Sequence, residues 1–231
     1  MIDWHNHILP SMDDGSRDVA ESIAMLEMHA SQGVSTVIAT PHFYANDESV
    51  ESFLARREAS YNKLKDRLPE DAPEILLGAE VKYYPGISRL ADLKRLRIAG
   101  SRLLLLEMPM NTWTESVIQE LIELSGKSGI GIVLAHIERY LRLQRSDVWE
   151  RLRRHGILMQ TNAGFFTTLS TKRKAMALLK EDYIHFLGSD CHNLTSRPPQ
   201  IGKAFEAIQK KLGVDYIGLM TEFGYSFLGQ V

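Results

Sequence analysis

The chain alternates short apolar segments with longer amphipathic or charged segments along most of its length. The apolar segments are continuous runs, which is typical of strands buried on both faces of a parallel sheet. The first expected strand leads to His7, and the next six lie at residues 34–39, 75–79, 103–106, 131–135, 157–161 and 184–187. Strands separated in this way by helices predict an α/β fold, either a mostly parallel sheet covered on both sides or a closed barrel.

The segments between these strands predict the covering helices. A helix over 17–32 begins after Ser16, its expected N-cap, and Gly33 closes it. Further helices are expected at 51–68, 115–128, 147–155, 171–180 and 200–212, with a short one near the C-terminus. No linker or internal repeat interrupts the pattern. A single domain over 1–231 is therefore expected, of a size that α/β barrels commonly reach.

Side chains that bind metal ions follow most of the expected strands. His5 and His7 lie two residues apart at the end of the first, so their imidazoles face the same side. The other strand ends carry His42, Glu80, Glu107, His136, Asp190 and His192. Because the active site of an α/β barrel lies at the carboxyl ends of its strands, barrel closure would bring all of these side chains to one rim.

A lone histidine at a strand end is more often a hydrogen-bonded surface group than a metal ligand. Buried strands ending in Glu80 and Glu107 are harder to explain, since carboxylates are rarely buried unless paired or metal-bound. Together the rim residues would leave buried charge uncompensated without cations. The nitrogen and oxygen donors suit Mn²⁺, Fe²⁺ or Zn²⁺, and their number implies more than one ion. Three histidines lie outside the pattern and are interpreted as structural: His29, His155 and His185.

Two arginines lie close to the expected ligands in sequence. Arg139 is three residues beyond His136, and Arg197 is five beyond His192. Adjacent metal ions ~3.5–4 Å apart ionise a bridging water and hold phosphate oxygens. Guanidinium groups match phosphate geometry bidentately, so both arginines are candidates for holding phosphate. A solvated loop arginine is an equally good interpretation of either one considered alone.

Composition excludes several classes of function. Lys and Arg number 27 against 29 Asp and Glu, and this balance gives no electrostatic footprint for nucleic acid or an anionic membrane. The single cysteine, Cys191, excludes an internal disulfide, and no export signal is recognisable. No apolar run approaches the roughly 20 residues of a membrane-spanning helix. We therefore expect a cytoplasmic protein without membrane insertion.

One motif offers a different chemistry. Residues 191–197 read C-H-N-L-T-S-R, which matches the C-x5-R spacing of cysteine-dependent tyrosine phosphatases. Such a loop needs free backbone amides around a phosphate, which favours glycines, and this one has none. If Asp190 and His192 face metal ions on an extended backbone, Cys191 must point the other way. We interpret its thiol as a buried packing group.

The motifs as a set resemble the polymerase-and-histidinol-phosphatase (PHP) domain family, whose pattern of H-x-H, D-G, P-H, two glutamates, H and D-x-H occurs here in order. More narrowly, the chain is similar to the bacterial metal-dependent protein-tyrosine phosphatases of capsule and exopolysaccharide synthesis. The likeness covers nearly the whole chain and is carried by M-I-D-W-H-N-H at 1–7, M-D-D-G-S at 12–16, G-A-E-V at 78–81, A-H-I-E-R-Y at 135–140, S-D-C-H-N at 189–193 and R-P-P at 197–199.

This resemblance implies a distorted seven-stranded (β/α) barrel, similar to a TIM barrel, with three divalent metal ions, usually Mn²⁺. The implied ligands are His5, His7, Glu80 and Asp190 for one ion, Glu80, Glu107 and His136 for a second, and Asp14, His42 and His192 for a third. Arg139 and Arg197 would hold the phosphate. The implied partner is the phosphotyrosine-rich tail of a cognate polysaccharide-synthesis tyrosine kinase. The chain departs from the family in the loop at 43–48 and in the tail at 221–229, which leaves substrate contacts and a homo-oligomer open.

The resulting hypothesis is hydrolysis of phosphotyrosine by metal-activated water, with cations and two arginines neutralising the developing charge. The main alternative is a phosphatase of the same fold that acts on a small phosphomonoester such as histidinol phosphate. A nuclease is disfavoured because the charge balance offers no basic groove for a polymer of phosphates. Amidohydrolases also begin with H-x-H, but the two glutamates fit phosphate chemistry better. A module that only binds the kinase is an alternative of another class.

Overall fold

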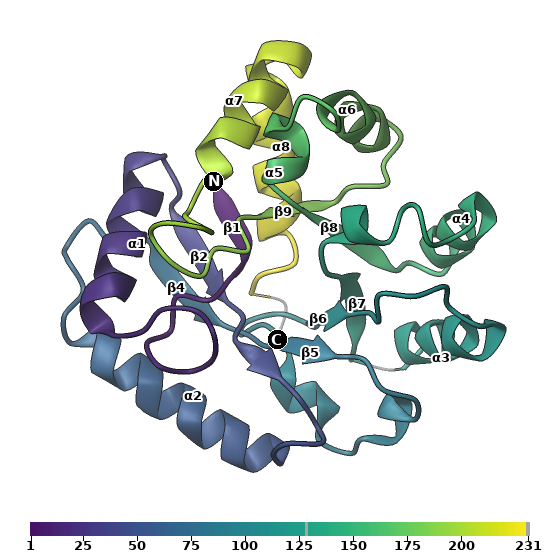
Figure 1. Cartoon of the computed structure of the whole chain (residues 1–231), viewed down its shortest axis with the longest axis horizontal. Helices are drawn as coiled ribbons and strands as arrows, with labels where there is room; N and C mark the ends of the chain where they lie inside the picture. The colour runs from purple at the N-terminus through teal and green to yellow at the C-terminus, as the bar shows by residue number, and fades with distance from the viewer. Residues whose placement is uncertain (128, 230–231) are drawn as a thin grey trace.

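Parallel strands curl into a ring with helices outside it in the computed structural model, which describes residues 1–127 and 129–229 (Figure 1). One hydrogen-bonded sheet has the order β1-β2-β4 and the other β3-β5-β6-β7-β8-β9, and every pair is parallel. The strands are β1 (Ile2–Asn6), β2 (Thr36–Ala39), β3 (His42–Phe43), β4 (Glu74–Leu77), β5 (Glu80–Lys82), β6 (Leu103–Glu107), β7 (Gly131–Leu134), β8 (Leu158–Asn162) and β9 (Phe186–Gly188).

Two positions in the ring are filled by strands that break in the middle. β2 resumes as β3 after Pro41, and β4 resumes as β5 after Gly78. Backbone hydrogen bonds carry the pairing across the breaks, since Gly78 N donates to Ala39 O at 2.8 Å and Glu80 N donates to Pro41 O at 3.0 Å. The strand predicted at 75–79 is therefore part of a longer, interrupted one, and Glu80 opens its second half.

The two edges of the ring meet between β1 and the segment that follows β9. Asp190 N donates to His5 O at 2.7 Å, and His7 N donates to Cys191 O at 3.0 Å. A parallel bridge joins Asn6 to Cys191 at the same place. Closure at this seam confirms the distorted seven-stranded barrel predicted from the sequence.

Helices cover the outside of the ring (Figure 1). They are α1 (Val19–Ser31), α2 (Val50–Lys65), α3 (Glu115–Ser125), α4 (Ser146–Arg154), α5 (Gly164–Thr167), α6 (Lys172–Lys180), α7 (Ile201–Leu212) and α8 (Val214–Tyr225). Short 3₁₀ turns, η1 (Ile87–Arg89) and η2 (Leu93–Leu96), take the place of a helix between β5 and β6, and η3 (Ile137–Arg139) follows β7. The predicted helices are all present with small shifts of boundary, although residue 128, the predicted end of α3, lies outside the described residues. No described helix is long and apolar enough to cross a membrane.

The prediction that Ser16 caps α1 is wrong. The cap is Asp18, whose carboxylate accepts a hydrogen bond from Glu21 N at 2.9 Å. Ser16 is occupied elsewhere, because its backbone N–H donates to His7 O at 2.9 Å and its hydroxyl donates to Asp18 O at 2.9 Å. The loop must first fold back against His7, so the helix begins two residues later.

Apolar side chains fill the interior of the ring below the strand ends. Trp4 stacks on Phe186 with ring centroids 4.0 Å apart, and Phe227 and Leu228 from the chain after α8 pack against the same cluster. The other members of this cluster include Ile2, Ile38, Ile98, Leu103, Leu105, Val133 and Ala135. Because this end of the barrel is filled, polar groups collect at the carboxyl ends of the strands.

The first strand contains an extra residue between Asp3 and Asn6, where its register against β2 shifts. As a result, Trp4 and His5 both face into the ring, while Asp3 faces outward to α1. There the buried carboxylate of Asp3 accepts four hydrogen bonds. Two come from Ser189, through N at 2.8 Å and Oγ at 2.6 Å, one from His5 N at 3.2 Å and one from His29 Nε2 at 2.7 Å. His29 therefore has a partner at the closing seam of the barrel.

The remaining two histidines also lie away from the rim. His155 Nδ1 donates to Arg151 O at 2.8 Å at the exposed end of α4. His185 lies just before β9 and not inside a strand as predicted, and its Nδ1 accepts a hydrogen bond from Met159 N at 3.1 Å.

Asp3→Ala should destabilise the barrel strongly, because it leaves four donors at the seam without their acceptor. We expect the free energy of unfolding to fall by about 3–5 kcal/mol, as for other broken buried ion pairs. Urea denaturation of the metal-free protein measures this, with Asp71→Ala on an exposed turn as the control. Equal stability of the two variants would show that the seam does not depend on Asp3.

Candidate metal centre

The carboxylate of Glu80 lies at the centre of the polar rim and is buried. Its Oε2 is 3.2 Å from His5 Nε2, 3.4 Å from His7 Nε2 and 3.0 Å from His42 Nδ1. Its Oε1 is 2.9 Å from His136 Nε2. One carboxylate, at the start of β5, thus faces four imidazoles, which come from the end of β1, from β3 and from the residue pair after β7.

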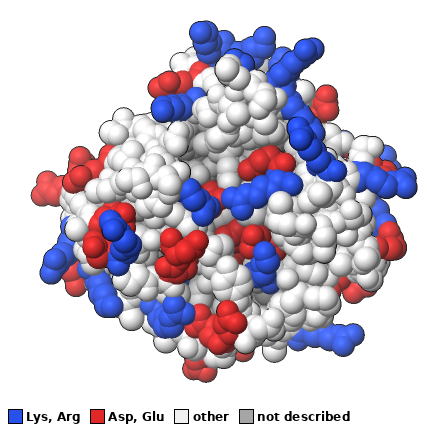
Figure 2. All heavy atoms as spheres, viewed as in Figure 1, with Lys and Arg blue, Asp and Glu red and all other residues white. Residues whose placement is uncertain are grey.

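Asp190 occupies the neighbouring part of the rim. Its Oδ1 lies 3.7 Å from His5 Nε2 and 3.6 Å from His7 Nε2. Both predicted phosphate-binding arginines reach the same carboxylate: Arg197 Nη2 lies 2.7 Å from Oδ1, and Arg139 Nη2 donates to Oδ2. Acidic and basic side chains accordingly meet at the centre of the face seen in Figure 2.

Asp14 lies at the outer edge of the rim with its side chain 65% exposed. Its Oδ1 is 3.5 Å from His42 Nε2 and 3.4 Å from His192 Nε2. The Nε2 atom of His192 is buried and has no hydrogen-bond partner among the described residues. Burial, together with the charges of His7 and Arg197, lowers the pKa of His192 to about 4, so its ring is neutral at pH 7 and this nitrogen offers a lone pair.

Glu107 completes the rim on the side of β6. Its Oε1 lies 3.8 Å from His136 Nε2, and its Oε2 lies 2.9 Å from Lys82 Nζ. The lysine contact could not be predicted from the sequence, because Lys82 lies beside Glu107 only through the register of β5 against β6.

All nine predicted ligands therefore converge on one rim. Donor atoms within 4.8 Å of one another form three groups there: His7, Asp14, His42 and His192; His5, His7 and Asp190; and His42, Glu80 and Glu107. These groups contain eight of the nine residues and divide them differently from the sets implied by the resemblance; His136 is in none of the groups, although its Nε2 lies 2.9 Å from Glu80 Oε1. His7 joins the Asp14 group, and His42 stands beside the two glutamates where the resemblance placed His136.

Charge complementarity within the rim is strong. Burial disfavours ionisation of Glu80 and Asp190, but the imidazoles, that of His5 foremost, outweigh it and hold the pKa of each carboxyl well below its usual range. Burial likewise opposes protonation of His7, yet Asp13 raises the pKa of that imidazole well above its usual value. Ionised carboxylates surrounded by imidazoles favour cations, and a metal ion binds such imidazoles by displacing their protons.

Residues 1–222 match the family described as "Capsular polysaccharide synthesis, CpsB/CapC". The chain belongs to this family. It is 31% identical to the tyrosine-protein phosphatase YwqE of Bacillus subtilis (strain 168), over 96% of this chain and 89% of that protein. It is 33% identical to the tyrosine-protein phosphatase CpsB of Streptococcus pneumoniae, over 92% of this chain and 91% of that one.

Known structures extend this likeness to the fold. One matching chain comes from the crystal structures of YwqE from Bacillus subtilis and CpsB from Streptococcus pneumoniae, described as unique metal-dependent tyrosine phosphatases. The TM-score is 0.83 at 26% identity, and the match covers 100% of this chain and 96% of the other. The CpsB/CapC barrel is thus present over its whole length.

In this CpsB/CapC family member, three imidazoles are oriented through their Nδ1 atoms. His7 Nδ1 donates to Asp13 Oδ2 at 2.7 Å, His5 Nδ1 donates to Gln160 Oε1 at 3.2 Å, and His192 Nδ1 donates to the Asp190 carbonyl at 3.0 Å. Each ring therefore directs Nε2 at the rim, as expected of metal-binding histidines.

Sequence reasoning missed these orienting partners. Asp13 is the neighbour of the predicted Asp14, and the pair of adjacent carboxylates was the available signal. Asn162, whose Nδ2 donates to Asp190 Oδ2 at 2.8 Å, ends β8, which corresponds to the expected strand at 157–161, and no rim residue is predicted at the end of that strand. Position at a strand end could have identified it. Gln160 carried no signal, because it lies inside a strand.

Cys191 lies on the opposite side of the chain from the rim. It is fully buried, with Sγ 4.0 Å from His29 Nε2 near the Asp3 seam. The predicted direction is correct, but the reasoning from an extended backbone is wrong, because Asp190 has a left-handed φ of 51°. A thiol facing α1 cannot attack a phosphate bound at Arg197, so the C-x5-R interpretation fails.

Asp13→Ala should weaken divalent metal binding about 10–100-fold, because loss of an outer-shell partner frees a ligand to rotate. Calorimetric titration of the metal-free protein with Mn²⁺ measures the affinity. Asp47→Ala is a matched control, since Asp47 is an exposed carboxylate beside the same rim. Unchanged affinity in Asp13→Ala would contradict the orienting role.

Proposed function

We propose that this CpsB/CapC family member is a metal-dependent protein-tyrosine phosphatase. Its substrate would be the phosphotyrosine-rich tail of a tyrosine kinase that controls capsular or exopolysaccharide synthesis. The observation that carries the proposal is the buried rim, where carboxylates and imidazoles meet within hydrogen-bonding distance beside two arginines. The names of its relatives, tyrosine-protein phosphatases, support the same substrate class.

The proposal includes three divalent metal ions, with Mn²⁺ as the first choice and Fe or Zn as alternatives. The ligands would be the nine rim residues: His5, His7, Asp14, His42, Glu80, Glu107, His136, Asp190 and His192. The donors fit such ions, because they are nitrogen and oxygen atoms and because the buried Nε2 of His192 has no hydrogen-bond partner in the described chain. When bound, the ions would supply Lewis acidity and lower the pKa of a coordinated water.

Arg139 and Arg197 would bind the phosphoryl oxygens. Both guanidinium groups contact the Asp190 carboxylate, which anchors them. Their side chains are nevertheless 36% and 39% exposed, so the solvent side of each group remains accessible. A second acceptor on each planar group is compatible with its five N–H donors. The two positive charges would then neutralise the charge that develops on phosphorus oxygens in the transition state.

The reaction forms a bond from a water oxygen to phosphorus and breaks the bond from phosphorus to the tyrosine oxygen. The attacking water releases a proton to solvent, and tyrosine leaves as phenolate, with a pKa of about 10, and takes a proton from solvent in its turn. Such a leaving group does not require a strong general acid. Asn162 holds Asp190 in place by its Nδ2 hydrogen bond, so the arginines and imidazoles keep fixed positions around the phosphate.

The open mouth of the site favours a protein tail over a small metabolite. Asp14 is largely exposed and both arginines are accessible, so no lid among the described residues encloses a small phosphomonoester. The proposal also places the enzyme in the cytoplasm, where a kinase has access to ATP and where the free thiol of Cys191 is expected to stay reduced.

Treatment with a chelator should abolish nearly all turnover of a phosphotyrosine peptide, and added Mn²⁺ should restore it, because the reaction depends on metal-activated water. Phosphate release and elemental analysis measure activity and metal content together. Cys191→Ser is the control and should keep its turnover, since the thiol faces away from the rim. Full activity after complete metal removal would refute the mechanism.

Tyr44→Ala should raise KM for a phosphotyrosine peptide about two- to tenfold with little change in kcat, because an aromatic contact contributes ~0.5–1.5 kcal/mol. Tyr44 is 39% exposed at the mouth and stacks on His42 with ring centroids 5.3 Å apart, so its free face can meet the substrate ring. Tyr44→Phe should behave as wild type. A phosphoserine peptide, which has no ring, should show no such change; an equal rise in its KM would exclude stacking.

A further inference from the structure

A basic groove lies between α6 and α7. It has a volume of about 690 Å³, and its floor is formed by Phe166, Met176, Ala177 and Ala207. Its walls carry five exposed cationic side chains: Lys172, Arg173, Lys180, Lys210 and Lys211. Lys and Arg gather over these helices at the top of Figure 2, on the face into which the metal rim opens.

The positive charge of the groove is not compensated locally. No carboxylate within residues 1–127 and 129–229 forms an ion pair with any of the five. Helix α6 contains no acidic residue, and the single acidic residue of α7, Glu206, lines a different hollow. The overall charge of −2 conceals this separation.

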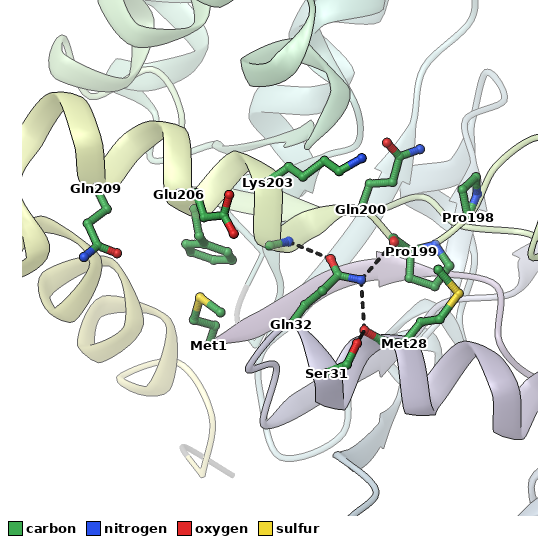
Figure 3. A pocket seen from close by; sticks show the side chains of 12 residues that line it. Met1, Met28, Ser31, Gln32, Pro198, Pro199, Gln200, Lys203, Glu206 and Gln209 are labelled. Atoms are coloured by element: carbon green, nitrogen blue, oxygen red, sulfur yellow. Dashed lines mark hydrogen bonds between the residues drawn. The ribbon is translucent and has the colours of Figure 1, made fainter.

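The other hollow beside α7 is different in character. It lies against α1, has a volume of about 620 Å³, and is lined by both Lys203 and Glu206 (Figure 3). Gln32 spans it, donating to Pro199 O at 2.9 Å and accepting from Gly202 N at 2.9 Å. This hollow therefore carries an acidic side chain beside its lysine, whereas every charged side chain that lines the α6–α7 groove is cationic.

The groove lies close to the metal rim along the chain. Phe166 in its floor follows Asn162, which holds Asp190 at the rim, by four residues. Four residues span at most ~14 Å even when fully extended. An extended peptide rises ~3.3 Å per residue, so a peptide bound at the rim reaches the groove within a short stretch of its own chain.

We infer that the α6–α7 groove binds a second phosphotyrosine of the same peptide whose first phosphotyrosine is being hydrolysed at the rim. This inference rests on the proposed function. A phosphotyrosine combines an aromatic ring with a charge of about −1.5 to −2, and the groove offers an apolar floor between cationic walls. Met176, which is partly exposed, and the methyl groups of Ala177 and Ala207 suit a ring, and the lysines and Arg173 suit a phosphate.

The test uses peptides with one phosphotyrosine or with two separated by increasing numbers of residues. Wild-type kcat/KM should be about tenfold higher for a doubly phosphorylated peptide once the spacer reaches about four residues, through a lower KM, because the second contact becomes intramolecular. Adjacent phosphotyrosines cannot span both sites and should show no gain.

The decisive variant is the triple substitution Arg173→Gln, Lys210→Gln and Lys211→Gln. It should abolish the preference for two phosphotyrosines while leaving kcat/KM for the single phosphotyrosine unchanged. The matched control is Lys63→Gln, Lys65→Gln and Arg67→Gln on and after α2, which removes the same charge from exposed side chains on another part of the surface and should keep the preference.

Three results would overturn the inference. The wild type could show no preference, the triple variant could retain it, or the triple variant could instead lose binding to phosphatidylserine vesicles or single-stranded DNA without any change toward peptides. Absence of any turnover of phosphotyrosine would refute the proposed function instead. In that case the affinity of the doubly phosphorylated peptide would be compared between the wild type and the triple variant. Equal affinities would overturn the inference about the groove.

Discussion

The polar rim depends on the buried carboxylate of Glu80. A carboxylate with almost no exposure persists only when positive or hydrogen-bonding groups surround it, and here four imidazoles do so. Those imidazoles belong to segments far apart in sequence. Glu80 therefore links the chemistry of the rim to barrel closure, because its partners meet only when the ring is complete.

Several irregularities of the barrel serve this arrangement. The break after Gly78 lets β5 begin with Glu80 at the level of the rim. The extra residue in β1 turns His5 inward while leaving Asp3 to tie β1 to the segment after β9. Gly188 lies against His5, and a Cβ there would be 2.5 Å from the His5 Cβ. A regular barrel would not bring these ligands together, so the departures from regularity have a functional reason.

Charge is distributed unevenly over the molecule in a way that suits a phosphorylated tail. At the rim, buried carboxylates face imidazoles and two arginines, whereas lysines without an ion pair among the described residues line the α6–α7 groove. Under the proposed function the first arrangement would hold metal ions and a phosphate, and under our inference the second would hold a further phosphotyrosine. A substrate with several phosphotyrosines would engage both, which links the turnover chemistry to selection of the substrate.

Barrel closure and the place of Asp14 entered the prediction only through the resemblance to a family. The sequence by itself predicted the alternation of strands and helices and a common rim for the side chains at the strand ends, because parallel strands end at one edge and their following residues must share it. It did not determine which donors stand together, since His42 and His7 take positions fixed by strand breaks and by the bulge in β1. The left-handed Asp190, the orienting Asp13 and Gln160, and the basic groove were likewise decided by the tertiary structure. Each depends on contacts between segments distant along the chain, and periodicity and spacing carry information only about neighbours in sequence.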